Sequence, residues 1–203
     1  CLGARGDGKT WAALWAMVMH ASEHHNAGHP LPTTWLGLRD TFANHTLSTK
    51  KSLEGRAWPA DAHWVLSQGD HLATFILEGV PFVELFLVGA DSPGDAEKVR
   101  TECQGLWVDE PAPAMGVSTG ITDDLYYMAC SSQRLETHAR VAILTSNYPD
   151  EEHWSAQRFV FQPQPGTMYF RIPAGERASP EFRAELERLY LTRPDLAKRL
   201  VKG

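Results

Sequence analysis

Residues 3–10, Gly-Ala-Arg-Gly-Asp-Gly-Lys-Thr, constrain the fold of this chain more than any other stretch. They fill the pattern G-x-x-x-x-G-K-[ST] of a P-loop, whose glycines let consecutive backbone N–H groups converge on a polyphosphate. Lys9 supplies positive charge to the terminal phosphates, and the Thr10 hydroxyl is a ligand for Mg²⁺. The pattern therefore predicts a nucleoside triphosphate site built from Gly3, Ala4, Arg5, Gly6, Asp7, Gly8, Lys9 and Thr10.

A P-loop connects a buried strand to a helix. Apolar residues at three- and four-residue spacing predict that helix over residues 9–26, with Gly28 as its stop. Only Cys1 and Leu2 precede the loop. We therefore interpret the sequence as a fragment and expect the supporting strand to be missing from it.

Residues 106–110, Leu-Trp-Val-Asp-Glu, form an apolar run that ends in two acids, as a Walker B strand does. In such a strand the aspartate holds Mg²⁺, and the glutamate polarises the attacking water as general base. An ordinary strand before a polar loop has the same form, but a preceding P-loop favours the Walker B interpretation. We predict Thr10 and Asp109 as metal-binding residues and Glu110 as a catalytic residue.

The remaining pattern alternates strands and helices. Strands are predicted over residues 33–38, 74–77, 82–88 and 140–145, with strand-like segments over residues 154–161 and 167–172. Helices are predicted over residues 41–56 after an Asp40 cap, over 123–135, after Ser179, and after Pro194-Asp195. This order predicts an α/β P-loop NTPase of the ASCE type, with a mostly parallel sheet flanked by helices. We assign residues 1–160 to the ATPase core and 161–203 to a small C-terminal helical or linker subdomain.

The net charge of −6 gives no general electrostatic case for binding nucleic acid. Any DNA contact needs a local basic patch. Lys50, Lys51 and Arg56 lie close together on one predicted helix and are the candidates for such contact. A charged helix face that is only solvated is the alternative.

Phosphoryl transfer also requires positive charge at the developing transition state. Arg5, inside the predicted loop, is the leading candidate within the same chain. Arg39 and Arg134 are candidates for contacts made from a neighbouring subunit, and surface salt bridges are the alternative for each of them.

Four histidines gather near the end of the first predicted helix: His20, His24, His25 and His29. A metal site there is conceivable, but no carboxylate or cysteine lies at a fitting spacing, so we interpret them as a solvated helix end. The three cysteines form no metal or disulfide pattern, which is consistent with a reducing compartment. No apolar run approaches the ~18 residues of a membrane span, and we expect no membrane contact.

The succession of motifs resembles the ATPase domain of the large terminase subunit, the DNA-packaging motor of tailed phages and related gene transfer agents. GARGDGKT is similar to the P-loop of that family, which commonly has arginine at the position of Arg5. Further stretches resemble family motifs in the same order, and they span nearly the whole chain: LGLRDT, LVGADSPGDAEKV, GLWVDEP, LTSNYPDEEHW and the tail SPEFRAELERLY.

The chain departs from the family pattern at several positions. Pro111 follows the predicted Walker B glutamate where the family more often has alanine, and Asn147-Tyr148-Pro149 stands where it usually has Asn-Pro-Pro. Asp7 places an acid inside the phosphate loop, which fits only if its side chain points outward.

The resemblance implies hydrolysis of ATP with Mg²⁺, coupled to translocation of double-stranded DNA into a procapsid. It implies that Thr145, Ser146 and Asn147 couple loss of the γ-phosphate to movement. It also implies a homo-oligomeric ring on the portal protein, a small terminase subunit as partner, and a location in the cytoplasm of the bacterial host rather than in the mature virion. Nothing in the sequence supplies a nuclease carboxylate cluster, so we expect no DNA cleavage.

Three other functions remain open from the sequence. A helicase or AAA-type remodelling ATPase would share the fold and the hydrolysis. A small-molecule or nucleotide kinase is the second alternative, against which the adjacent acids Asp109 and Glu110 favour water as the nucleophile. The third is an oligomerisation and docking module without nucleotide binding.

Overall fold

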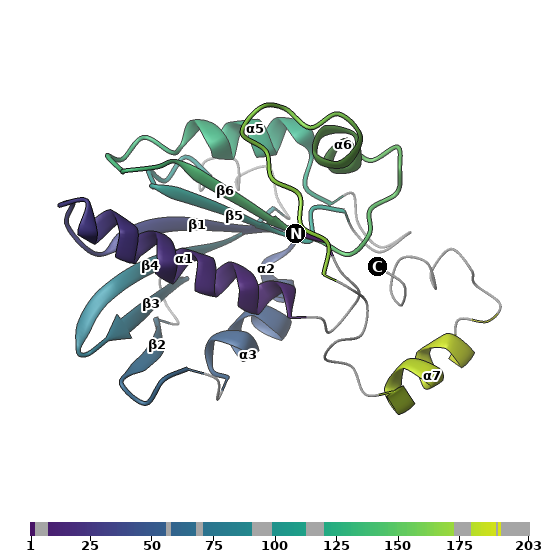
Figure 1. Ribbon diagram of the computed structural model, residues 1–203, viewed down its shortest axis with the longest axis horizontal. Helices are drawn as coiled ribbons and strands as arrows, with labels where there is room; N and C mark the ends of the chain where they lie inside the picture. Colours follow the sequence, from purple (N-terminus) through teal and green to yellow (C-terminus); the bar gives the residue numbers. More distant parts are fainter. Residues whose placement is uncertain are drawn as a thin grey trace.

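The fold is built on one six-stranded sheet, seen in a computed structural model (Figure 1). The structure describes residues 1–2, 8–55, 58–67, 71–90, 99–112, 120–172, 180–189 and 191. The strand order is β2-β3-β4-β1-β5-β6. The bounds are Thr33–Arg39 for β1, Ala62–Ser67 for β2, Leu72–Leu77 for β3, Val80–Gly89 for β4, Gly105–Asp109 for β5 and Val141–Thr145 for β6.

Four neighbouring strands of this sheet are parallel, because β1 pairs in parallel with β4 and β5, and β5 pairs in parallel with β6. Strands β2, β3 and β4 form an antiparallel meander at the other side. The turn between β3 and β4 is Glu78-Gly79, and both residues have positive φ, as a tight two-residue hairpin requires. The mostly parallel sheet is confirmed, and the strands predicted over residues 74–77 and 82–88 pair as a hairpin. The sequence analysis missed β2.

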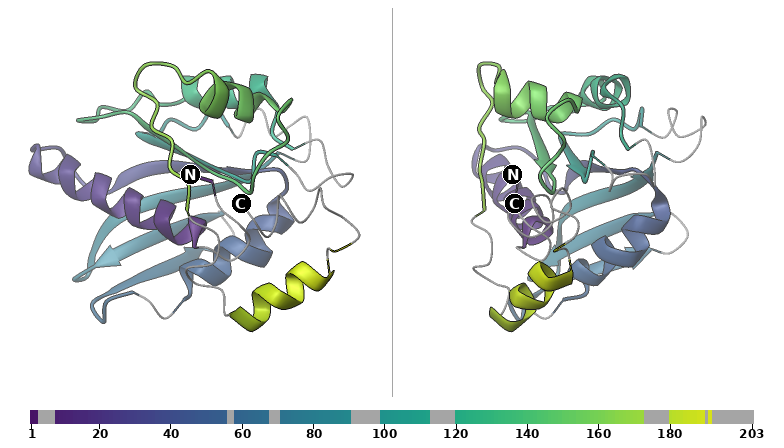
Figure 2. Two further views of the ribbon diagram at one scale, coloured as in Figure 1. Left: turned by 45° about the vertical axis from the view of Figure 1, so that its right-hand side comes forward. Right: turned by 90° about the vertical axis from the view of Figure 1, so that its right-hand side faces the viewer.

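Helices cover both faces of the sheet. Alternate residues of β1 point to opposite faces, so Trp35 packs with Leu14 and Met17 of α1 (Lys9–Asn26), whereas Leu36 packs with Tyr126 of α5 (Asp123–Ser131). In Figure 1, α1 crosses in front of the strands, and α5 lies above β6 beside α6 (Trp154–Ala156). Both views in Figure 2 keep α5 and α6 on the side away from α3 (Lys50–Leu53).

Three predicted elements differ in the structure. Residues 154–161 were predicted to be strand-like and are helical: α6 starts after the cap His153 and continues as the π-helix η2 (Gln157–Phe161). The predicted helix 41–56 is divided into α2 (Phe42–Asn44), the π-helix η1 (His45–Thr49) and α3, and its cap is the Thr41 hydroxyl rather than Asp40. The helix predicted over 123–135 ends at Ser131.

The end of the chain follows the prediction only in part. Residues 167–172 contribute only a bridge between Leu2 and Arg171, and Leu2 makes a second bridge to Ser146. Helix α7 (Pro180–Leu189) is present as predicted. Ser179, the helix expected after Pro194-Asp195 and residues 3–7 lie outside the described residues. The boundary drawn between residues 160 and 161 stays a prediction.

Large indole rings fill the core on the α1 side. A Cβ at Gly105 would lie 2.4 Å from the Trp35 ring, so only glycine lets that ring lie across β5. Near the start of α1, the ring centroids of Trp11 and Trp58 are 4.8 Å apart, and those of Trp15 and Trp58 are 4.9 Å apart. This aromatic cluster joins the start of α1 to the segment after α3.

The histidines at the end of α1 correct one interpretation, because two of them are not solvated. The segment before β6 covers His20 and His24, which are 5% and 0% exposed. His20 Nε2 bonds the Ala139 carbonyl at 2.8 Å, and the His138 ring lies 4.6 Å from the His20 ring. Among the residues that the structure describes, no group of three or more side chains could hold a metal ion. In the same part of the chain, no helix has the length and apolar character needed to cross a membrane.

From the burial of His20 and His24 we predict that the stability of the protein depends on pH. Burial lowers the pKa of His20 and of His24, and neighbouring imidazoles lower that of His24 further. Below the ordinary value of about 6.5 the unfolded chain therefore binds more protons than the folded chain, and the free energy of unfolding decreases as pH falls. Each histidine contributes at most about 1.4 kcal/mol per pH unit.

The test is chemical denaturation between pH 7 and pH 5. We expect His24→Gln to lose stability more slowly with falling pH than the unmodified chain. The matched control is His25→Gln, because His25 is exposed on the same helix and its replacement should leave the slope unchanged. Equal slopes for His24→Gln and the unmodified chain would contradict the prediction.

Candidate active site

Several of the predicted site residues lie at one edge of the sheet. Parallel strands direct their carboxyl ends to the same edge, where α/β proteins bind their ligands. Strands β1, β5 and β6 end there with Arg39, Asp109 and Thr145. Helix α1 starts at the same place, because Lys9 in its first turn bonds to Asn147 just beyond β6.

Lys9 is held beside β6 in this structure. Gly8 is the N-cap of α1 and has a left-handed φ of 83°, a conformation that favours glycine. Lys9 is only 7% exposed, and its Nζ donates to Asn147 Oδ1 at 3.0 Å. The predicted phosphate-binding lysine and the predicted coupling asparagine are therefore in direct contact.

Asp109 is buried with a partner on each carboxylate oxygen. The Thr145 hydroxyl donates to Oδ1 at 2.7 Å, and Oδ2 lies 2.9 Å from the Arg39 guanidinium. Trp107 Nε1 in turn donates to the Thr145 hydroxyl at 2.9 Å. Burial raises the pKa of the Asp109 carboxyl, and the charge of Arg39 and the Thr145 hydrogen bond oppose that rise.

Glu110 leaves the sheet in a strained conformation. Its φ of 53° lies in the left-handed region, which costs a non-glycine residue about 1–2 kcal/mol. Its own N–H donates to the Thr145 carbonyl at 2.7 Å, and its Oε2 accepts from the Asn147 N–H at 3.0 Å. Desolvation and the adjacent Asp109 carboxylate raise the pKa of Glu110 to about 6.

Asn147 therefore contacts both Lys9, the predicted phosphate-binding residue, and Glu110, the predicted general base. Its side-chain oxygen binds Lys9, and its backbone N–H binds Glu110. Ser146, which precedes it, is 2% exposed, and among the described residues its hydroxyl has no hydrogen-bond partner. A single residue therefore contacts both Lys9 and Glu110.

The metal-binding residues that we predict supply suitable ligands. Mg²⁺ prefers hard oxygen donors and keeps several waters when proteins bind it. Asp109 offers a buried carboxylate, and Thr10 stands in the first turn of α1 directly after Lys9. The oxygen donors of these two residues therefore suit a magnesium ion, which they would hold with water as further ligands.

The arginine candidates occupy different surroundings. Arg39 turns inward to Asp109 of its own chain and also donates to the Ser48 hydroxyl. Arg134 is exposed, and its neighbour Gln133 bonds the carbonyls of Gln104 and Val141 at the amino ends of β5 and β6. Arg134 thus belongs to the opposite edge of the sheet from the two acids. Arg5 lies outside the described residues.

The candidate DNA-binding lysines also differ in their surroundings. Lys51 is exposed, whereas Lys50 Nζ lies 5.4 Å from the centre of the Phe42 ring. That contact engages part of the Lys50 side chain within the protein. Arg56 lies outside the described residues.

The contacts of two residues near Asp109 were missed in the sequence analysis. Trp107, which donates to the Thr145 hydroxyl, was interpreted only as an apolar strand residue. Arg39 was interpreted as a contact to a neighbouring subunit or as a surface salt bridge. A signal existed for Arg39, since a charged residue that ends a buried strand must meet an opposite charge if its neighbour is also buried. Which strand lies beside it cannot be read from local sequence patterns.

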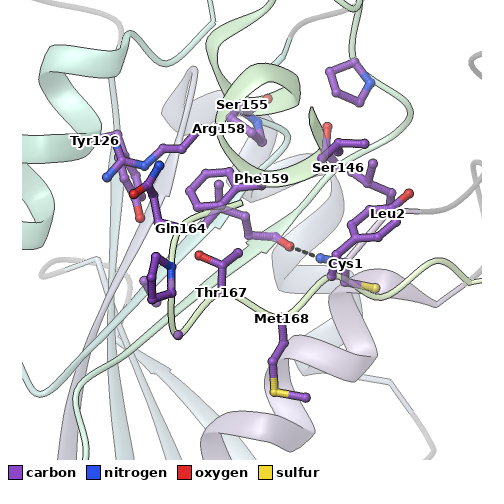
Figure 3. A pocket seen from close by; sticks show the side chains of 18 residues that line it. Cys1, Leu2, Tyr126, Ser146, Ser155, Arg158, Phe159, Gln164, Thr167 and Met168 are labelled. Carbon is purple, nitrogen blue, oxygen red and sulfur yellow. Dashed lines mark hydrogen bonds between the residues drawn. The ribbon is translucent and has the colours of Figure 1, made fainter. Parts of the chain in front are cut away.

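A cavity of about 330 Å³ lies next to this site, beside β6 (Figure 3). Cys1, Leu2 and Ser146 form one side, Tyr126 and Arg158 the other, with Phe159 between them. Asp109 and Glu110 do not line it. Ser146 thus lies between the cavity and the cluster of acids.

Comparison with known proteins identifies the same fold in solved structures. No model of a protein family matches the sequence, and no curated protein matches it. Two crystal forms of the large terminase from a thermophilic bacteriophage match with TM-scores of 0.70 and 0.72, at 13% and 11% identity. Both matches cover 100% of this chain, and they cover 47% and 46% of the terminase. A structure of that terminase in complex with ADP matches with a TM-score of 0.67 at 13% identity, covering 94% of this chain and 44% of that one.

At such identities the likeness establishes the fold, and it confirms the fold that the resemblance implied. The chain spans less than half the length of the terminase structures that it matches.

The Thr145 hydroxyl gives a prediction about stability. Thr145→Val keeps the shape of the side chain but leaves Trp107 Nε1 without an acceptor and Asp109 Oδ1 without a donor. Because both groups are buried, we expect a loss of roughly 1–3 kcal/mol in the free energy of unfolding, measured by urea titration. Thr46→Val is the matched control, since Thr46 is exposed and its hydroxyl makes only a 3.4 Å bond. A loss no larger than that of the control would contradict the prediction.

Proposed function

We propose that this chain is the ATP-hydrolysing motor domain of a large terminase subunit, which drives double-stranded DNA into a procapsid. The observation that carries the proposal is the joint attachment of Lys9 and Glu110 to Asn147, on a fold shared with phage large terminases. The structures of the thermophilic phage terminase with ADP and with ATP-gamma-S support ATP as the nucleotide.

The proposed roles follow from the chemistry of each group. The loop over residues 3–10 holds the phosphates with its backbone amides, and Lys9 neutralises the β- and γ-phosphates. Thr10 and Asp109 hold Mg²⁺, which supplies neutralisation of phosphate charge when bound. Arg5 is the candidate for charge stabilisation within the same chain.

Glu110 acts as the general base in this proposal. With a pKa of about 6 the carboxyl is mostly ionised at neutral pH, yet it is a stronger base than an ordinary glutamate. It accepts a proton from a water molecule while the water oxygen attacks the γ-phosphorus and the bond to the leaving ADP oxygen breaks. The rate should decrease as pH falls through about 6, because the protonated carboxyl cannot accept that proton.

Coupling to movement is assigned to Thr145, Ser146 and Asn147. A bound γ-phosphate would attract Lys9 away from Asn147 Oδ1. The backbone N–H of Asn147 also donates to the Glu110 carboxylate. Binding of a γ-phosphate would thereby alter the contacts of Glu110 and of the residues that follow β6. Loss of phosphate restores the contact between Lys9 and Asn147.

The assembly around this motor is proposed on the same basis. It comprises a homo-oligomeric ring on the portal protein, a small terminase subunit and double-stranded DNA, in the cytoplasm of the bacterial host and outside the mature virion. We propose that this chain does not cleave DNA. Among the alternatives, a kinase is disfavoured because the adjacent acids Asp109 and Glu110 favour water as the nucleophile. A helicase or an AAA-type remodeller would share the P-loop fold, but the solved structures that match this chain are large terminases.

Glu110→Gln tests the catalytic assignment. The amide keeps the size of the side chain but cannot accept a proton, so we expect ATP hydrolysis to fall by about 100-fold or more. Binding of a non-hydrolysable ATP analogue, measured by isothermal titration, should be retained. Glu136→Gln is the matched control, because the Glu136 side chain is 88% exposed. Hydrolysis near the unmodified level in Glu110→Gln would refute the assignment, and absence of analogue binding to the unmodified chain would favour a docking module.

Lys51→Ala tests the proposed DNA contact. If Lys51 meets a phosphate, its loss should reduce the slope of log affinity against log salt by about 0.9 for duplex DNA. The double variant Lys50→Ala/Lys51→Ala should reduce it further. Arg140→Ala is the control, because Arg140 is exposed just before the amino end of β6. Unchanged salt slopes in both lysine variants would refute contact at this helix.

A further inference from the structure

We infer that Arg39 is a positioning residue of the magnesium site, which holds the Asp109 carboxylate from within the same chain. This assignment replaces a role for Arg39 in a neighbouring subunit. It rests on the proposed ATPase function, because the site it organises is the one proposed to hold Mg²⁺.

The first support is the burial of the pair. Arg39 lies 2.9 Å from Asp109 Oδ2, and the two side chains are 13% and 3% exposed. A buried ion pair of this kind loses much more than the contact when one partner is removed, because the other charge stays behind uncompensated. Arg39 therefore meets a requirement of its own chain, and a guanidinium engaged in this way is not presented to another subunit.

The second support is the register of the sheet. Strands β1 and β5 are parallel neighbours with Leu38 opposite Val108, so Arg39 and Asp109 are the next residues along the two strands. Side chains at neighbouring positions of adjacent strands lie on the same face of a sheet. The contact is thus built into strand pairing and does not depend on a loop conformation.

The third support is a contact behind the guanidinium. Arg39 also donates to the Ser48 hydroxyl, and that hydroxyl donates to the Asn44 carbonyl at 2.9 Å. Ser48 belongs to the π-helix η1, and π-helical turns are frequent at functional positions. His45 of the same turn is fully buried and bonds the Val88 carbonyl at 3.1 Å, which ties η1 to the end of β4. Arg39 is therefore held from both sides.

These contacts orient the carboxylate without using up its capacity. Each carboxylate oxygen can accept more than one hydrogen bond. Arg39 occupies one position on Oδ2, and Thr145 occupies one on Oδ1. A magnesium-bound water would use one of the remaining acceptor positions on this carboxylate, whose orientation Arg39 and Thr145 fix. Loss of Arg39 should therefore weaken metal binding more than nucleotide binding.

Magnesium dependence of hydrolysis tests the assignment in the full chain. Loss of a group that orients a metal ligand typically weakens metal affinity by about 10–100-fold. We expect Arg39→Gln to raise the Mg²⁺ concentration for half-maximal ATP hydrolysis by that factor, and Arg39→Lys to recover part of it by restoring the charge. Affinity for an ATP analogue in EDTA should change by less than about 2-fold. Arg100→Gln, a change at an exposed arginine, is the matched control.

A second readout does not require turnover. Binding of Mn²⁺ to the complex with the ATP analogue, followed by electron paramagnetic resonance, should weaken in Arg39→Gln by the same factor as the magnesium dependence. If Arg39→Gln does not fold, Ser48→Ala keeps the guanidinium but removes the hydroxyl that contacts it and that donates to the Asn44 carbonyl, and it should weaken Mn²⁺ binding in the same direction. Unchanged Mn²⁺ affinity in a folded Arg39→Gln, or in Ser48→Ala where it replaces that variant, would overturn the inference.

Mixing variants separates the two possible locations of Arg39 action. A subunit with Glu110→Gln still carries Arg39, so it would restore hydrolysis to an Arg39→Gln subunit if the arginine acted between subunits. Recovery on mixing would overturn the inference, and its absence supports action within the chain. If the unmodified chain bound Mn²⁺ and the analogue in an Arg39-dependent way but hydrolysed no ATP, the proposed function would fail while the positioning role held.

Discussion

The buried negative charge of Asp109 determines how this edge of the sheet is organised. A carboxylate that is 2% exposed loses most of its hydration, and the protein must replace it with other partners. A guanidinium from β1 and a hydroxyl from β6 provide that replacement, so three neighbouring strands contribute to one group. The Trp107 indole then anchors the hydroxyl from the opposite side. The strand order, the register and the identity of residue 145 are therefore all required to give this buried carboxyl its partners.

The position of the Glu110 side chain depends on the backbone conformation of that residue. Glu110 leaves β5 in a left-handed conformation that glycine would adopt without cost, and the bond from its N–H to Thr145 helps to hold that conformation. The turn directs the side chain away from Asp109 and toward Asn147. Two consecutive acids thereby obtain different partners: Asp109 is held by side chains of the neighbouring strands, and Glu110 is held by the backbone N–H of Asn147. Strain of this kind is common where chemistry dictates the residue.

Local patterns predicted the elements that depend on local physics. Helix α1 follows from apolar spacing after a glycine-rich loop, and the β3–β4 hairpin follows from its Glu78-Gly79 turn. The partners of Asp109 could not be predicted in this way, because β1 lies between β4 and β5, an order that no single segment encodes. The burial of His20 has the same origin, since its partner Ala139 is 119 positions away. Residues 154–161 were wrongly predicted to be strand-like, because aromatic residues such as Trp154 favour strands. In the structure Trp154 starts a helix capped by His153, and its indole N–H donates to the Ile121 carbonyl.

The tryptophan cluster at the start of α1 has an optical consequence. Trp11 follows Thr10 directly, and its ring contacts Trp58, which also contacts Trp15. Indoles in such close contact influence one another's absorption, near-ultraviolet circular dichroism and fluorescence. A displacement of the first turn of α1 would change the geometry of these rings before it reached the rest of the core. The chain thus carries an intrinsic spectroscopic reporter one residue away from the proposed phosphate site, with no need for an attached dye.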